Sequence, residues 1–157
     1  MERIASFNVD HTTLLPGLYI SRVDGDITTY DLRTRKPNTP DLMSHAEMHS
    51  TEHLFATFAR NSSIKDSIIY FGPMGCQTGY YLLIRDACHE RVVDFVKEIT
   101  AAILEYDGEM PGNSEPECGN YANLSIEAAK EGLARYYQVI KDWSVDRLSY
   151  NNGAKNE

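Results

Sequence analysis

The sequence predicts one domain of the α+β class, with a mostly antiparallel sheet packed against helices. Short segments rich in β-branched and aromatic residues are paired around turn signals, and three longer segments have helical periodicity, without regular alternation of strand and helix. The 157 residues are 42% hydrophobic and 24% charged, which suits a single domain with a buried core. We expect residues 1–150 to form this domain and the polar residues 151–157 to be a disordered tail.

The first two strands are predicted to form a hairpin. Residues 18–23 and 27–33 have strand character, and the Asp24-Gly25 pair between them is a hairpin turn signal. The polar stretch 34–41 contains two prolines, which end the second strand and lead to the first helix. We therefore expect an antiparallel pair.

A second pair of strands is predicted at residues 67–71 and 77–85. The sequence Gly-Pro-Met-Gly at residues 72–75 turns the chain between them. This arrangement places Cys76 at the start of a strand, next to a tight turn.

Three helices are predicted. Residues 44–60 begin with Ser44 and Glu47, whose spacing is that of a capping box. Residues 90–106 have apolar side chains at helical spacing, and so does the segment that begins near Ser125. These helices are expected to cover at least one face of the sheet.

The first predicted helix carries two histidines four residues apart, His49 and His53, with Glu52 between them. This spacing brings the two imidazoles onto one face with their Cβ atoms about 6 Å apart, so that one metal ion can bridge them. Glu52 is placed to act as a base rather than as a third ligand. His45 is about 12 Å along the axis from His53, and we interpret it as structural or as a support for the ligands. Two helical histidines without any ligand are the plainer alternative.

The three cysteines are an odd number, which favours thiol or metal chemistry over a disulfide framework. Two imidazoles and one thiolate leave the fourth position of a tetrahedral ion open for water or substrate, as in catalytic sites. The residues alone leave Cys76 and Cys118 as equal candidates for the third ligand, with a structural thiol as the alternative for each. Cys88 is expected to be buried as a small hydrophobic residue.

The charge balance disfavours nucleic acid as a partner. Fifteen basic residues against 23 acidic ones give a net charge of -8, and the basic residues are dispersed along the chain. The first residues contain no apolar leader and the sequence has no run of 18 apolar residues, so neither secretion nor a membrane is predicted. The expected location is the cytoplasm.

Two other functions fit the histidine motif. The sequence His49-x-x-Glu52-His53 is that of an inverted zinc-peptidase motif, for which Glu115 or Glu117 would be the third ligand. Such a peptidase has no need of a reactive cysteine. A non-enzymatic binding module stabilised by a metal is the second alternative.

Five blocks of the sequence carry a resemblance to a known family. They are residues 6–12 (Ser-Phe-Asn-Val-Asp-His-Thr), 31–33 (Asp-Leu-Arg) followed by 37–38 (Pro-Asn), 49–54 (His-Ser-Thr-Glu-His-Leu), 73–81 (Pro-Met-Gly-Cys-Gln-Thr-Gly-Tyr-Tyr) and 118–119 (Cys-Gly). In this order they resemble the S-ribosylhomocysteine lyases, which make the precursor of autoinducer-2. The resemblance runs through most of the chain.

The resemblance implies that the chain cleaves S-ribosylhomocysteine to homocysteine and 4,5-dihydroxy-2,3-pentanedione. In that reaction the sugar carbonyl migrates from C1 to C3, assisted by a metal, and the thiol leaves by β-elimination. The implied ligands are His49, His53 and Cys118, with one divalent ion per chain. Fe(II) is the ion favoured by the resemblance, with Zn(II) and Co(II) as alternatives.

The resemblance also implies an acid/base pair, Glu52 and Cys76, and three substrate contacts, Ser6, His11 and Arg33. It implies a homodimer with two sites at the interface, where Cys76 and the substrate contacts of one chain face the metal of the other. A surface charge, a turn hydroxyl and a helix cap are the structural alternatives for Arg33, Ser6 and His11, respectively.

The sequence departs from the usual family pattern at four positions. Tyr70 stands where many members have an Asp, six residues before the cysteine, and Thr34 replaces a usual Phe. Ser50 and Thr51 replace a Thr and a bulky aliphatic residue, a change expected to affect packing rather than metal ligation.

Overall fold

The computed structural model of the chain describes residue 2 and residues 4–150. Four strands form one sheet in the order β1-β2-β4-β3, with every neighbouring pair antiparallel. The strands are β1 (Gly17–Asp24), β2 (Ile27–Arg33), β3 (Ile68–Pro73) and β4 (Gly79–Arg85). The helices are α1 (His45–Arg60), α2 (His89–Glu105) and α3 (Ile126–Ile140). The predicted α+β class is confirmed, whereas the predicted tail 151–157 lies outside the described residues.

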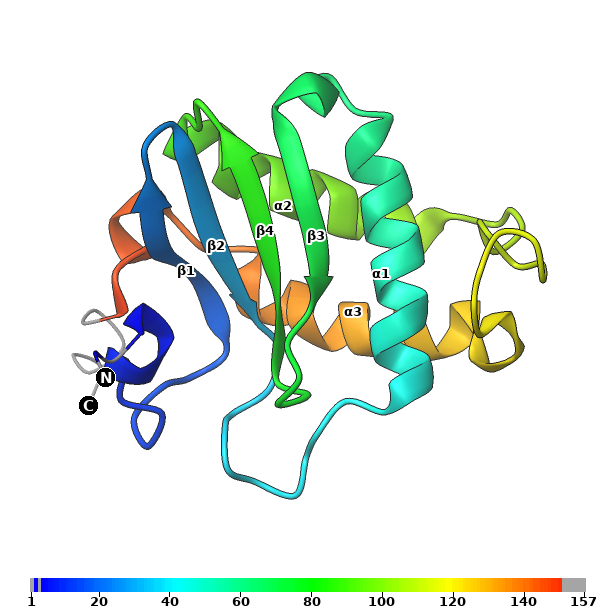
Figure 1. Ribbon diagram of the computed structural model, residues 1–157, viewed down its shortest axis with the longest axis horizontal. Helices are drawn as coiled ribbons and strands as arrows, with labels where there is room; N and C mark the ends of the chain where they lie inside the picture. The colour runs from blue at the N-terminus through cyan, green and yellow to red at the C-terminus, as the bar shows by residue number, and fades with distance from the viewer. Residues whose placement is uncertain (1, 3, 151–157) are drawn as a thin grey trace.

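The three helices are arranged around one side of the sheet. In Figure 1, α2 and α3 lie behind the strands, and α1 stands beside β3 and packs against both other helices. Two short 3-10 helices, η1 (Ala5–Asn8) and η4 (Val145–Arg147), lie at the β1 edge of the sheet. Among the described residues no helix is both long enough and apolar enough to cross a membrane.

The two predicted hairpins are present, but the boundaries of the second differ, because β3 continues through Gly72 and Pro73, which were predicted to lie in the turn. The β1–β2 turn contains Gly25 with a φ of 60°, as the Asp-Gly signal predicts. In the second hairpin, β4 begins at Gly79 rather than at residue 77, because Gln77 has a left-handed φ of 63° that turns the chain there. Cys76 therefore lies in the turn itself, and the prediction that it starts a strand is wrong.

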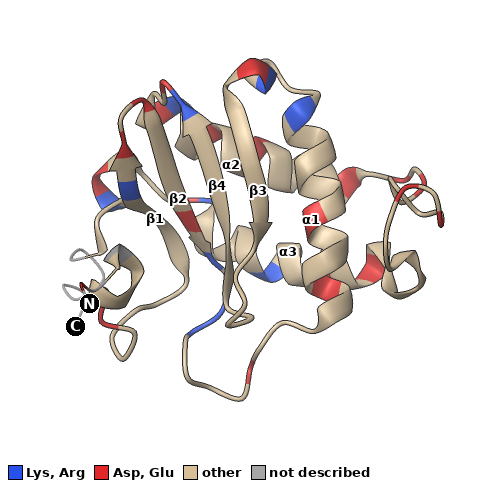
Figure 2. Ribbon diagram, viewed as in Figure 1, with Lys and Arg blue, Asp and Glu red and all other residues tan. Residues whose placement is uncertain are grey.

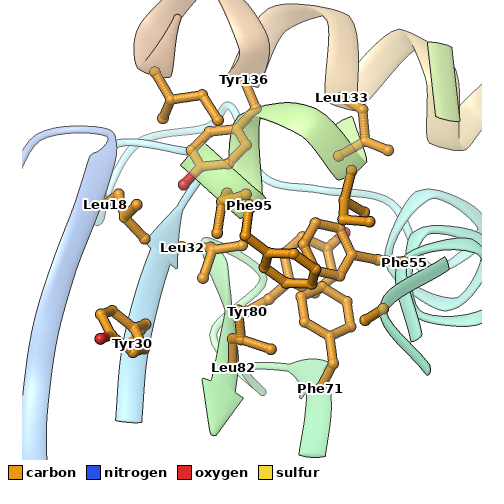
Figure 3. Packing of buried hydrophobic residues seen from close by; sticks show 14 of the residues in the cluster. Leu18, Tyr30, Leu32, Phe55, Phe71, Tyr80, Leu82, Phe95, Leu133 and Tyr136 are labelled. Atoms are coloured by element: carbon orange, nitrogen blue, oxygen red, sulfur yellow. The ribbon is translucent and has the colours of Figure 1, made fainter. Parts of the chain in front are cut away.

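Stacked aromatic rings join α1 to the sheet. The ring of Phe55 lies on that of Phe71 with 4.2 Å between centroids, and Phe71 stacks in turn on Tyr80 at 5.1 Å. Phe95 of α2 meets Phe55 edge-on, so four elements share this cluster (Figure 3). Aromatic pairs in these orientations add to the stabilisation from burial alone. The cluster fixes which side of α1 faces the core.

The caps of α1 and α3 form as predicted. The Ser44 hydroxyl accepts a hydrogen bond from the Glu47 backbone amide at 3.1 Å, and the Ser125 hydroxyl accepts one from the Ala128 backbone amide at 3.1 Å. The backbone amide of Ser125 also donates to the buried hydroxyl of Ser50 at 2.8 Å. The start of α3 is thereby fastened to the middle of α1.

A buried ion pair holds the loop between β2 and α1. Arg35 is 3% exposed, and its Nη2 donates to the Glu47 carboxylate at 2.7 Å. Asp41 joins this pair to α3, because it also accepts from Arg135. Burial raises the pKa of Glu47, and the nearby Arg35 opposes the rise.

We expect Arg35→Met to lower the free energy of unfolding by about 3 kcal/mol at pH 7, because it leaves a half-buried carboxylate without its cation. Loss of Arg35 raises the pKa of Glu47 further, so the variant's deficit should be larger at pH 7 than at a lower pH, where Glu47 takes up a proton. Urea denaturation at the two pH values measures both effects.

Arg85→Met is the matched control, since the Arg85–Asp26 pair is exposed and should contribute little. Equal losses in the two variants, or a deficit of Arg35→Met that grows toward low pH, would contradict this account.

Candidate active site

The side chains of His49, His53 and Cys118 come together on the side of α1 that faces the loop after α2. We call these three side chains the metal group. The ligand nitrogen and sulfur atoms all lie within 4.8 Å of one another. The Cys118 Sγ is 3.3 Å from the His49 Nε2, and the two imidazole centroids are 4.6 Å apart. Within the described part of the chain, this is the one group of three or more such side chains that can hold a metal ion.

Hydrogen bonds orient both imidazoles toward this point. The His49 Nδ1 lies 2.6 Å from the Asn123 side-chain oxygen, and the His53 Nδ1 lies 2.8 Å from the backbone oxygen of Pro111. Because each partner is an acceptor, each ring donates from Nδ1 and keeps the lone pair of Nε2 for an ion. Sequence reasoning missed Asn123 and Pro111, since no local pattern marks either residue.

The loop fits closely around the histidines. Gly112 has a φ of 68°, and a Cβ at this position would lie 2.9 Å from the His53 Nδ1. The Asn120 amide donates to the Cys118 Sγ at 3.5 Å, as expected for a sulfur acceptor. The missing side chain of Gly112 lets the loop approach His53 closely, and the Asn120 hydrogen bond shapes the loop around Cys118.

The surroundings of this group favour a cation. Residues 98–129, which include the loop, contain no Lys or Arg, and Figure 2 shows acidic residues along it. Two neutral imidazoles and one thiolate are ligands that divalent transition metals accept, and three protein ligands leave a fourth position open. The residues present therefore fit a catalytic rather than a structural metal site.

Glu52 lies on α1 beside the two histidines and is half-buried. Within the described residues its carboxylate makes no hydrogen bond or ion pair. It is therefore available to accept or donate a proton at the edge of the metal group.

A second group of predicted site residues surrounds the turn between β3 and β4. The Arg33 Nη1 donates to the Thr78 hydroxyl at 2.6 Å and lies 3.9 Å from the Cys76 Sγ. The Cys76 Sγ is 3.0 Å from the same hydroxyl, and Cys76 itself is exposed. Arg33 is only 3% exposed, which is inconsistent with a simple surface charge on a strand.

His11 shares a hollow with Cys76. The two residues line a cavity of about 250 Å³ together with the loop between β2 and α1. The His11 Nδ1 lies 2.9 Å from the backbone oxygen of Val9, which leaves Nε2 free. Ser6 lines a different hollow, of about 230 Å³, beside Tyr81. Of the three predicted substrate contacts, the structure thus brings His11 and Arg33 to Cys76 and leaves Ser6 apart.

Among the described residues, the metal group lies outside the hollows around Cys76 and Ser6. The cavity that contains His11 and Cys76 and the one that contains Ser6 are not lined by His49, His53 or Glu52. In Figure 1 the β3–β4 turn lies on the sheet side of α1, whereas the loop with Cys118 lies on its other side.

Two expectations for individual residues are wrong, and one alternative function lacks its third ligand among the described residues. Cys88 is exposed rather than buried, because it is the N-cap of α2 at the surface, with its Sγ 3.6 Å from the Glu90 carboxylate. His45 is exposed in the first turn of α1 and supports no ligand among the described residues. Glu115 and Glu117 lie outside the metal group, so the third ligand required by the peptidase alternative is absent.

Two of the departures from the family pattern, Thr34 and Tyr70, lie away from the metal group. Thr34 is buried, and its hydroxyl donates to the backbone oxygen of Thr78 at 3.3 Å. Tyr70 is 49% exposed, and its ring lies over Gly72, where a Cβ would meet the phenol. Neither residue touches the metal group.

Comparisons with known proteins agree with this geometry. A sequence model of the family described as S-ribosylhomocysteinase (LuxS) matches residues 4–146. The chain is 44% identical over 155 residues to the S-ribosylhomocysteine lyase of Finegoldia magna, covering 96% of this chain and 99% of the relative. Its identity to the lyase of Clostridium acetobutylicum is 42% over 156 residues, with the same coverage. The lyase of Borreliella burgdorferi is 38% identical over 156 residues, again with 96% and 99% covered. The chain therefore belongs to the S-ribosylhomocysteinase (LuxS) family.

Proposed function

We propose that the chain is a metal-dependent S-ribosylhomocysteine lyase, which releases homocysteine and 4,5-dihydroxy-2,3-pentanedione. The observation that carries the proposal is the convergence of His49, His53 and Cys118 in a chain of this family. A divalent ion held there supplies Lewis-acid polarisation of the sugar carbonyl. We assign Fe(II) as the native ion, with Zn(II) and Co(II) as ions that the same ligands accept.

The chain's own residues perform the proton transfers. Each carbonyl migration removes a proton from the carbon next to the carbonyl and delivers one to the former carbonyl carbon, so protein groups that accept and return protons must lie beside the sugar. Glu52 has no hydrogen-bond or ion-pair partner among the described residues and lies beside the metal group, and the Cys76 thiol is exposed beside a cation, Arg33. Arg33, His11 and Ser6 are assigned to hold the substrate.

The active form is proposed to be a homodimer in which each site takes residues from both chains. Support comes from the separation of the Cys76 group and the metal group on either side of α1 in one chain. Large apolar side chains that remain exposed near the N-terminal segment and the sheet supply a surface for a second copy. These are Ile4, Phe7, Leu42 and Tyr70.

We place the enzyme in the cytoplasm. The proposed chemistry needs Cys76 and Cys118 as thiols, and both are free cysteines. A reducing compartment maintains them in that form.

The lyase is tested by free thiol released when anaerobic, metal-loaded protein is mixed with S-ribosylhomocysteine. We expect Cys76→Ala and Glu52→Gln each to lower the rate by at least about 100-fold, because each removes a proton-transfer group. Cys88→Ala is the matched control and should keep full activity. Absence of thiol release by a folded, metal-bound wild type would refute the proposal, and peptide hydrolysis that survives Cys76→Ala would indicate a peptidase.

The ligand orientation seen here predicts an effect on metal affinity. Asn123→Ala removes the acceptor that orients His49 and should weaken Zn(II) binding by roughly 10- to 100-fold, measured by competition with a chelating dye. Asn120→Ala, which removes an exposed side chain from the same loop, should bind Zn(II) as the wild type does. Equal affinity of the two variants would show that the Asn123 contact does not support the ligand.

Shared sites predict that two inactive variants complement each other. A dimer with one Glu52→Gln chain and one Cys76→Ala chain would have one intact site and one doubly altered site. Random pairing after co-expression should therefore restore about one quarter of the wild-type activity. Sites formed within single chains would give no recovery, and that result would exclude the shared arrangement.

A further inference from the structure

The Arg33 guanidinium forms an ion pair with the buried carboxylate of Asp31. The Arg33 Nη2 donates to the Asp31 Oδ2 at 2.6 Å, and neither side chain is more than 3% exposed. The opposite nitrogen, Nη1, points to Thr78 and Cys76. Because the guanidinium is planar and rigid, a contact that fixes one nitrogen also fixes the direction of the other.

Residues 148–150 supply a second contact to the Asp31 carboxylate. The Tyr150 hydroxyl donates to the Asp31 Oδ2 at 2.9 Å, across 119 positions in the sequence. The segment reaches this place because the Ile20 amide donates to the Leu148 backbone oxygen at 2.8 Å. The Tyr150 ring also stacks on Tyr19, with 5.0 Å between centroids.

This tyrosine favours the ionised form of the carboxylate. Burial raises the pKa of Asp31, while the Arg33 cation and the Tyr150 hydroxyl oppose the rise. A neutral Asp31 would hold Arg33 less firmly, since a hydrogen bond to a charged acceptor is the stronger one.

We propose that Tyr150 is a positioning residue of the enzyme, which acts through Asp31 to hold the Arg33 guanidinium against Cys76. Residues 148–150 thus become part of the arrangement that prepares Cys76 for proton transfer. The inference deepens the proposed lyase function and rests on it for the role of Cys76. The contacts that link Tyr150 through Asp31 to Arg33 are independent of that function.

Alkylation of the cysteines tests the proposal without the lyase reaction. Metal-loaded full-length protein is treated with iodoacetamide at neutral pH, and mass spectrometry follows modification of Cys76 and of the exposed Cys88 in the same molecules. A cation held beside a thiol favours the reactive thiolate. We therefore expect Tyr150→Phe to lower the ratio of the Cys76 rate to the Cys88 rate by at least about threefold.

Tyr136→Phe is the matched control. Its hydroxyl is also buried, but it donates to the backbone oxygen of Gly17 at 3.0 Å rather than to a side chain of the site. This variant should keep the wild-type ratio, and both variants should keep the wild-type metal content. Thiol release from S-ribosylhomocysteine should fall at least about threefold in Tyr150→Phe alone.

An unchanged alkylation ratio in Tyr150→Phe would overturn the proposal. An equal fall in both variants would also overturn it, because general loosening would then be the cause. A wild type that releases no thiol from S-ribosylhomocysteine would refute the lyase function, while the alkylation ratio would still decide whether Tyr150 positions Arg33.

Discussion

The one-turn spacing of His49 and His53 on a rigid helix is the constraint on which the metal group depends. The spacing within the helix sets the two imidazoles relative to each other, but both face Cys118 only if the rotation of α1 about its own axis is fixed. The stack of Phe55 on Phe71 sets that rotation from the core side. On the other side, the Ser125 amide bonded to the Ser50 hydroxyl holds the segment that carries the ligand loop. Packing and ligation therefore specify the same orientation of α1.

Around Cys76, buried ion pairs rather than aromatic packing fix the local structure. The pair Asp31–Arg33 lies at the end of β2, and the pair Arg35–Glu47 begins the loop that follows. Burying either partner alone would be costly, so each pair accepts only one local arrangement. The direction of the Arg33 guanidinium is thus set by the fold before any substrate arrives.

Local signals predicted the elements, and long-range contacts escaped prediction. The Ser44 cap and the turn at Gly25 depend on neighbours within four residues, so both were readable from the sequence. Cys88 was assigned to the core by its residue type, although its position just before a surface helix exposes it. The contacts of Asn123 with α1 and of Tyr150 with β2 span 74 and 119 positions, and no local pattern encodes them.

The placement of the two site cysteines also explains how one chain can give them different roles. A thiolate within reach of a divalent ion becomes a ligand, as the position of Cys118 beside His49 favours. Cys76 lies in a separate turn beside Arg33, so its cationic neighbour cannot form a coordinate bond with sulfur. A guanidinium therefore leaves the lone pair of the sulfur available for a proton. In the proposed dimer, substrate rather than ligation brings the metal and this thiol together, which keeps Cys76 available for acid–base work.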